Sequence, residues 1–394
     1  MIQMNQLPKR ILSIDVLRSI IMFLMIFVND VAGVDRIPKW IEHTAADYDG
    51  MGFSDLIFPA FLFIVGLSLP FAIQGRIKNG DSYVSLVIYI VLRALALIVM
   101  GFFHVNMESY TYDQAVLSYP VFMIILTVGF FLIWLDYPEK INKLLKYGLI
   151  TLGVLTVVTM AYLYKGGSAD HPKGLEPSWW GILGIIGWAY LFSAVVYLLT
   201  YRKPVLLLIA FIIFALINIT SHMDLLHVEL WTIGDASSIT LMLGGTVIST
   251  LYALFISKGE DKKLWIGLTA AGLACILFGF IIRPYTGGIS KIYSTPAWVF
   301  ICMGITVLIF ELLIYKVDRK GKKNWFNFIK PAGTSTLTCY LVPYLLYSLL
   351  SLIHFKYSYA LTYGIGGILR SFFVAFVVIR IVALMENRGI RLKV

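Results

Sequence analysis

The feature that most constrains this chain is a series of about twelve long apolar runs, separated only by short polar segments. Each run has about 17 to 24 residues, the length an α-helix needs to cross roughly 30 Å of hydrocarbon and about twice the length of a transmembrane β-strand. With 59% hydrophobic and only 14% charged residues, a water-soluble domain of this size could not bury its apolar surface. The sequence therefore predicts an all-α, polytopic transmembrane helical bundle.

The apolar runs also give the approximate bounds of the spans. These lie near 12-33, 53-74, 85-105, 116-135, 147-165, 179-200, 205-221, 233-256, 265-283, 297-316, 331-354 and 363-385. No soluble domain or low-complexity linker interrupts the series, so we expect residues 1-394 to form a single transmembrane domain. Only a short turn that ends in Pro204, a residue favoured at the start of a helix, separates the sixth span from the seventh. We expect a helical hairpin at 179-221.

Lysine and arginine residues set the orientation, because they are enriched in cytoplasmic segments. If the N-terminus is cytoplasmic, seven of the 32 fall outside and four within spans, which leaves 21 inside. The outer seven are Arg36, Lys39, Lys165, Lys173, Arg283, Lys291 and Lys356, and the four within spans are Arg18, Arg93, Arg370 and Arg380. Both termini are therefore expected to be cytoplasmic. Topology and anionic lipid then explain the net charge of +10, and no nucleic-acid partner is expected.

The sequence contains no recognisable metal-binding or disulfide pattern. Cys275, Cys302 and Cys339 lie in or beside apolar runs without paired spacing, and none of the six histidines belongs to a motif such as HExxH. We expect the cysteines to be packing residues, and we expect no metal.

Three polar residues flank the outer end of the first span: Asn29, His43 and Asp55. A neutral imidazole can accept a proton from an amine or carry an acyl group, and a neighbouring amide can donate to an oxyanion. Asp55 either holds the imidazole of His43 in one tautomer or is a carboxylate favoured at the start of a helix. His43 is also compatible with a solvated loop histidine that has no function. The spacing does not decide between these alternatives.

Charged residues also occur at and within the inner halves of spans. Asp15 and Arg18 are three residues apart, so they share a helix face and can pair. They form either an interfacial ion pair, with Arg18 extended toward water, or an anion-binding corner that faces inward. Arg93 lies deep in the third span with no carboxylate within one turn, a costly position unless the cation faces a polar cavity or a bound anion. Arg370 and Arg380, in the last span, are weaker candidates.

The outer segment 287-298 combines two glycines with Lys291, Tyr293 and Trp298. Most such segments anchor a helix end at the membrane surface. Aromatic faces beside polar donors also suit the stacking and orientation of a sugar ring. The segment is therefore either an interfacial anchor or part of a sugar site.

Four segments together resemble the heparan-alpha-glucosaminide N-acetyltransferase family. They are RILSIDVLR at 10-18 with Asn29, His43 with DLIFP at 55-59, KIYSTPAW at 291-298, and PAGTSTL at 331-337. Their order and approximate spacing hold across most of the 394 residues, and the first segment is the most specific. The resemblance implies a transmembrane acyltransferase that uses cytoplasmic acetyl-CoA to acetylate a sugar on the far side of the membrane.

The resemblance also implies roles for individual residues. His43 would be the catalytic histidine, Asn29 its neighbour in the site, and Asp55 a support for its outer half. Asp15, Arg18 and Arg93 would lie along the path of the acetyl-CoA. Lys291 would lie near the acceptor, with Tyr293 and Trp298 beside it on the substrate side. The chain departs from the family pattern at Ser19, at Ser118 and Tyr119, and at Ser335, and the hairpin at 179-221 is an addition to the family's core.

The expected function is therefore an acetyl-CoA-dependent N- or O-acetyltransferase in the bacterial cytoplasmic membrane. Its partners would be membrane lipid and an amino sugar or other glycan group on the outer side, with a homodimer as one option for its assembly. Whether His43 becomes acetylated or acts only as a general base stays open. A transporter or flippase for a glycan precursor is the first alternative, because charged residues within spans can line a route. A catalytically inactive family member is the second, because of the departures from the family pattern at Ser118, Tyr119 and Ser335.

Overall fold

A computed structural model describes residues 11–111, 115–168, 170–225, 231–322 and 324–394, so Arg10 of the first motif lies outside the described residues. The α-helices are α1 (Leu12–Val31), α2 (Phe53–Lys78), α3 (Tyr83–Asn106), α4 (Tyr119–Trp134), α5 (Lys143–Leu163), α6 (Gly181–Leu199), α7 (Pro204–His222), α8 (Ser237–Ser257), α9 (Asp261–Ile282), α10 (Pro296–Leu313), α11 (Lys330–Thr334), α12 (Thr336–Leu352) and α13 (Gly364–Asn387). Short 3₁₀ turns occur at η1 (Met107–Ser109), η2 (Arg283–Tyr285) and η4 (Tyr359–Leu361), and a π-helical turn, η3 (Ile314–Arg319), extends α10. The strands β1 (Gly166–Gly167) and β2 (Pro172–Lys173) pair antiparallel in the loop after α5.

Each expected span contains a helix, which confirms the all-α membrane-type bundle. Ten helices in the described residues are long and apolar enough to cross a membrane, whereas α4 and α12, with 16 and 17 residues, are shorter. One expected span differs, because 331-354 is divided into α11 and α12. The division lies at Ser335, whose φ of −127° and ψ of 47° are not helical.

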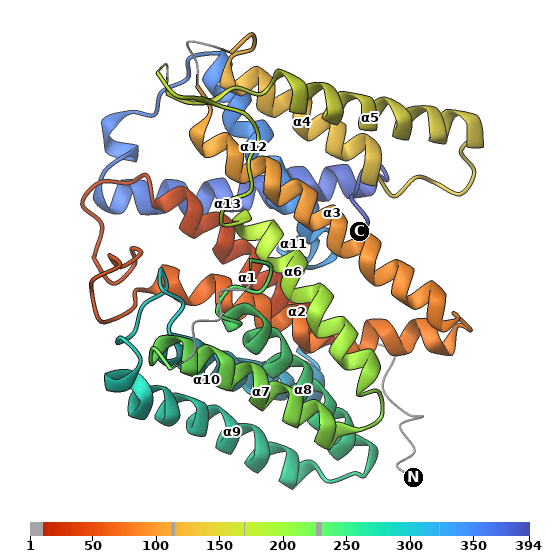
Figure 1. Ribbon diagram of the computed structural model, residues 1–394, viewed down its shortest axis with the longest axis vertical. Coiled ribbons are helices and arrows are strands. Elements are labelled where there is room, and N and C mark those ends of the chain that lie inside the picture. Colours follow the sequence, from red (N-terminus) through yellow and green to blue (C-terminus); the bar gives the residue numbers. More distant parts are fainter. Residues whose placement is uncertain (1–10, 112–114, 169, 226–230, 323) are drawn as a thin grey trace.

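The helices run roughly alongside one another, with α5 near one edge of the bundle and α9 at the opposite edge (Figure 1). α8 and α10 are among the most buried helices, whereas α5, α7 and α9 carry many exposed apolar side chains. These exposed faces are suited to contact with lipid. The loop after α1 and the connection before α10 lie at the same end of the bundle (Figure 1). The residues that the two loops carry can therefore meet there.

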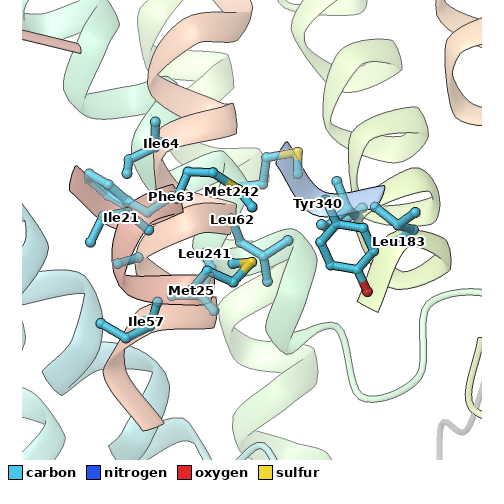
Figure 2. Close-up of a cluster of buried hydrophobic side chains, with 14 of the residues drawn as sticks. Ile21, Met25, Ile57, Leu62, Phe63, Ile64, Leu183, Leu241, Met242 and Tyr340 are labelled. Atoms are coloured by element: carbon cyan, nitrogen blue, oxygen red, sulfur yellow. The ribbon is translucent and has the colours of Figure 1, made fainter. Parts of the chain in front are cut away.

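The core is formed by apolar side chains from helices that are distant in sequence. Figure 2 shows Met25 of α1, Phe63 of α2, Leu183 of α6, Met242 of α8 and Tyr340 of α12 in one buried cluster. Small residues bring α2 and α8 into direct backbone contact, as is common between helices in membranes.

Two glycines make this α2–α8 contact. A Cβ atom at Gly66 would overlap the carbonyl oxygen of Met242, and one at Gly245 would overlap that of Phe63. This tight pairing fixes α2, which begins at the candidate site.

Candidate active site

His43 and Asp55 form a hydrogen-bonded pair at the N-terminal end of α2. The Nδ1 atom of His43 lies 2.7 Å from Oδ1 of Asp55. The side chain of Asp55 is fully buried, whereas that of His43 is 34% exposed. Because a carboxylate only accepts hydrogen bonds, the imidazole directs its Nδ1–H at Asp55, and in the neutral ring Nε2 keeps its lone pair. The pair therefore presents a nucleophilic or basic nitrogen on a side chain that is about one-third exposed.

Asp55 is fixed by several donors besides His43. Its Oδ2 atom accepts hydrogen bonds from the backbone N–H groups of Gly52 and Thr44 and from the Thr44 hydroxyl, at 2.9 to 3.1 Å. The bond from Gly52 belongs to the helix start, where Asp55 is the third residue of α2. The indole N–H of Trp298 donates to the carbonyl oxygen of Asp55 at 3.1 Å. The carboxylate thus serves both as a helix cap and as the anchor of the histidine.

Lys291 completes the cluster from the connection before α10. Its Nζ atom lies 3.0 Å from Nδ1 and 3.4 Å from Nε2 of His43, and 4.0 Å from Oδ1 of Asp55. Burial lowers the pKa of Lys291 from its ordinary value, and the charge of Asp55 opposes this shift. The sequence indicated a lysine near an acceptor, and the structure places it directly against the imidazole.

The two outer loops that carry His43 and Lys291 are joined by Asp49. Its carboxylate accepts hydrogen bonds from the guanidinium of Arg283 at 2.9 and 3.0 Å and from the backbone N–H of Ile289 at 2.7 Å. The hydrogen bond from Ile289 has the largest effect and lowers the pKa of Asp49; burial opposes this shift, and the contact with Arg283 lowers the pKa further. Gly50 donates in addition to the carbonyl oxygen of Ile289 at 3.0 Å. These contacts hold Lys291 in register with His43.

The other residues expected on the outer side are placed differently. Asn29 is exposed at the end of α1, and no hydrogen bond between described residues joins it to His43. Tyr293 is 60% exposed, so its ring is open to the outside. Trp298 is only 2% exposed. Its indole faces are covered by protein in this conformation, and it supports the backbone of Asp55 instead of offering a stacking surface.

Sequence reasoning missed Asp30, the residue that follows Asn29. Asp30 is buried in a polar network. Its carboxylate pairs with Arg370 of α13 at 2.8 Å and accepts hydrogen bonds from Ser371 at 2.6 Å and from Tyr347 of α12. Arg370, an arginine within an apolar run, was the available signal, since such a cation needs an anionic partner. The network connects the C-terminal end of α1 to α12 and α13.

A cavity of about 450 Å³ lies between α1, α2, α3, α6, α11 and α12, and we call it the inner cavity because Asp15 and Arg18, from the first turns of α1, line it together with Arg93. Arg18 pairs with Asp15 at 3.4 Å and donates to Ser68 at 2.5 Å and to the carbonyl oxygen of Gly333 at 3.3 Å. This last bond joins the first and the last of the four motif segments. A side chain at Gly333 would collide with Ser19, so glycine permits the close approach of α11 to α1.

Arg93 enters the cavity with aromatic partners. It donates to the hydroxyl of Tyr89 at 2.8 Å, and its guanidinium lies 5.0 Å from the ring centre of Tyr190. No ion pair joins it to a carboxylate within the described part of the chain. The cavity therefore presents cationic groups that can receive an anion. Most of its other walls are apolar, with Met25, Phe61 and Leu183 among the lining residues.

No group of three or more histidine, cysteine or acidic side chains suited to a metal ion occurs among the described residues. Cys302 and Cys339 are buried and Cys275 is partly buried, and all three are free thiols.

Comparison with known proteins links the chain to a family. Residues 10–233 match the family described as a domain of unknown function, DUF5009. The chain is 34% identical over 104 residues to the heparan-alpha-glucosaminide N-acetyltransferase of Homo sapiens and 32% identical over 97 residues to that of Mus musculus. These alignments cover 26% and 25% of the chain but only 15% and 14% of the relatives' length. The resemblance predicted from the motifs is confirmed.

Proposed function

We propose, from the premise that this chain belongs to the DUF5009 family, that it is a transmembrane acetyltransferase. Its donor would be cytoplasmic acetyl-CoA, and its acceptor an amine or hydroxyl group of an amino sugar or other glycan outside the membrane. The observation that carries the proposal is the partly exposed imidazole of His43, oriented through Nδ1 by the buried Asp55. The partial similarity to curated N-acetyltransferases supports the same chemistry.

His43 can serve acetyl transfer in two ways. In the first, Nε2 attacks the thioester carbonyl, the C–S bond breaks, and the sulfur leaves as a thiolate. The acceptor then bonds to the acetyl carbon, loses its proton, and releases the imidazole. In the second, Nε2 takes a proton from the acceptor while the acceptor attacks the thioester carbonyl directly, the C–S bond breaks, and the sulfur leaves as a thiolate. In both, Asp55 holds the tautomer and stabilises the charge that develops on the ring.

The inner cavity is our candidate for the donor site. Arg18 and Arg93 supply guanidinium groups for phosphate, and the apolar walls suit a flexible chain that extends toward the outer site. The orientation that puts the N-terminus and C-terminus in the cytoplasm opens this end of the bundle to cytoplasmic acetyl-CoA. Asp15 would orient Arg18 through their ion pair. A single domain of 394 residues would thus carry both the donor site and the acceptor site.

On the acceptor side we assign Lys291 and Tyr293 to substrate binding. Lys291 lies against the imidazole, and the exposed ring of Tyr293 can stack on a sugar. Trp298 acts through Asp55, which makes it a positioning residue. Asn29 is exposed at the outer end of α1, where an acceptor would approach. Its amide would therefore contact the substrate and not His43.

The test is acetylation of the purified protein by radiolabelled acetyl-CoA without an acceptor. An acetyl-histidine route predicts label that is released by hydroxylamine and absent from His43→Ala. His171→Ala, which alters an exposed histidine of another outer loop, is the matched control and should be labelled like the wild type.

A direct route predicts no labelled protein, yet acetyl-CoA is still consumed with a glucosamine acceptor, and this consumption is lost in His43→Ala. Thioester cleavage that His43→Ala leaves intact would refute the assignment of His43. No cleavage in wild-type protein that binds CoA would refute the proposed activity, and would favour the transporter or the inactive family member.

A further inference from the structure

The last turn of α7 makes hydrogen-bond contacts with the segment that carries Lys291. His222, the final residue of α7, has its Nδ1 atom 2.8 Å from the carbonyl oxygen of Asn218 and its Nε2 atom 2.8 Å from the carbonyl oxygen of Tyr293. Asn218, which is fully buried, donates from its amide to the carbonyl oxygen of Ser294 at 3.4 Å. Two successive carbonyl groups of the segment are thus held by one turn of α7.

These contacts determine the protonation of His222. A carbonyl oxygen can only accept a hydrogen bond, so an imidazole that bonds two carbonyls must carry a proton on both nitrogens. Such a ring is a cation. An acidic group lies close, since Oδ2 of Asp235 is 3.6 Å from Nε2; burial raises the pKa of Asp235, and hydrogen bonds from Ser237 oppose this shift. Within the described residues 223–225, 231–236 and 290–295, the other ionisable groups are Asp224, two residues beyond His222, Lys291, and the hydroxyl of Tyr293, whose ring is exposed.

The segment that α7 contacts, Lys291–Ser294, is a strained turn. Ser294 has a φ of +53°, a left-handed conformation that a serine rarely adopts. The turn is closed by a bond from the N–H of Ser294 to the carbonyl oxygen of Lys291 at 3.1 Å. Lys291 is therefore the first residue of a turn whose far side α7 holds in place. Strained conformations of this kind persist where surrounding contacts enforce them.

We propose that His222 is a positioning residue for Lys291 and that it acts as a doubly protonated imidazolium. It holds the turn Lys291–Ser294 so that Lys291 stays against His43. His222 belongs to the last turn of the helix that follows Pro204, so the added hairpin contributes to the outer site. The role assigned to Lys291 rests on the proposed function, whereas the charge of His222 does not.

Nuclear magnetic resonance of protein with ¹⁵N-labelled histidine tests the charge. Wild-type protein at pH 6 should show one histidine, absent from the spectrum of His222→Leu, with both ring nitrogens protonated. A neutral His222 at pH 6 would overturn the proposal, whether or not the protein transfers acetyl groups.

A second measurement tests the positioning. In His222→Leu, Lys291 should react with an amine reagent at least several-fold faster at pH 7 than in wild type, and the KM for the acceptor should rise about tenfold while donor hydrolysis stays unchanged. His171→Leu is the control and should resemble wild type. Unchanged Lys291 reactivity in folded His222→Leu would reject the positioning role. Faster labelling without any acetyl transfer in wild type would reject the proposed function alone.

Discussion

Arg93 and Lys291 are single cations that the fold removes from bulk water, and their partners differ. Arg93 has two tyrosines beside an apolar cavity, whereas Lys291 lies between an imidazole and a buried carboxylate. A cation with only neutral partners is costly in a membrane until an anion arrives. A cation beside a fixed anion has part of that cost offset. The two residues therefore lead to different predictions.

Arg93→Gln should weaken CoA binding, because it removes a charged hydrogen-bond donor from the cavity. The expected loss is about 1.5–3 kcal/mol, the range for a hydrogen bond to a charged group. This corresponds to roughly a tenfold to hundredfold rise in dissociation constant. Calorimetric titration of CoA into detergent-solubilised protein would measure it. Arg202→Gln, at an exposed inner turn, should bind CoA like wild type. If Arg93→Gln also binds CoA with the affinity of the wild type, Arg93 is a packing residue.

Lys291 should lose its proton at a lower pH than exposed lysines do, because burial lowers its pKa. At a given pH a larger fraction of the amine is then neutral, and only the neutral amine attacks an acylating reagent. Labelling with acetic anhydride from pH 6 to 11, followed by mass spectrometry, should therefore give a curve for Lys291 shifted toward acid relative to that of Lys356. Lys356 is exposed in another outer loop and serves as the internal reference. Coincident curves would contradict the shift.

The sequence predicted part of the candidate site at this scale. An aspartate that follows a histidine and begins a helix allowed for the contact between Asp55 and His43. The contact of Lys291 with His43 was not predictable, because it depends on loops paired through Asp49. Asn29 and Asp30 show a second limit. Neighbouring residues on a helix point about 100° apart, and an apolar run does not say which one faces the interior.

At the scale of elements, α2 and α8 depend on backbone contact. Gly66→Val should destabilise the protein by about 1–3 kcal/mol, since the new side chain must displace the Met242 carbonyl. Gly75→Val, on the same helix where nothing lies within 4 Å of the added Cβ, carries the same change in helix propensity without the clash. Thermal unfolding in detergent should give a clearly lower transition temperature for Gly66→Val than for Gly75→Val. Equal temperatures would show that the interface can separate at no cost.

Helix positions were predictable because long apolar runs leave few alternatives in a membrane. The expected span 179-200, for example, corresponds to Gly181–Leu199. The interruption at Ser335 was not predictable, because it depends on tertiary contact. Gly333 approaches Ser19 of α1, and Arg18 binds the Gly333 carbonyl. The segment ends one helix there and starts another, although its composition suits a continuous span.

At the scale of the whole molecule, the distribution of lysine and arginine predicts which end faces the cytoplasm. In a background without Cys275, Cys302 and Cys339, a cysteine at Lys173 should react with an impermeant thiol reagent added to intact cells. One at Lys262 should react only after the membrane is opened. Both side chains are exposed, so access to the reagent is the only difference. The opposite pattern would put His43 in the cytoplasm and remove the need for transfer across the membrane.

The buried pair Asp30–Arg370 has a consequence for the order of biosynthesis. The two residues are separated by 340 positions, and at a synthesis rate of about 5–20 residues per second the ribosome needs roughly 17–70 s to pass from one to the other. For that time the carboxylate of Asp30 in α1 has neither Arg370 nor Ser371 as a partner. A chain that ends before α13 therefore retains in α1 a carboxylate that lacks its cationic partner.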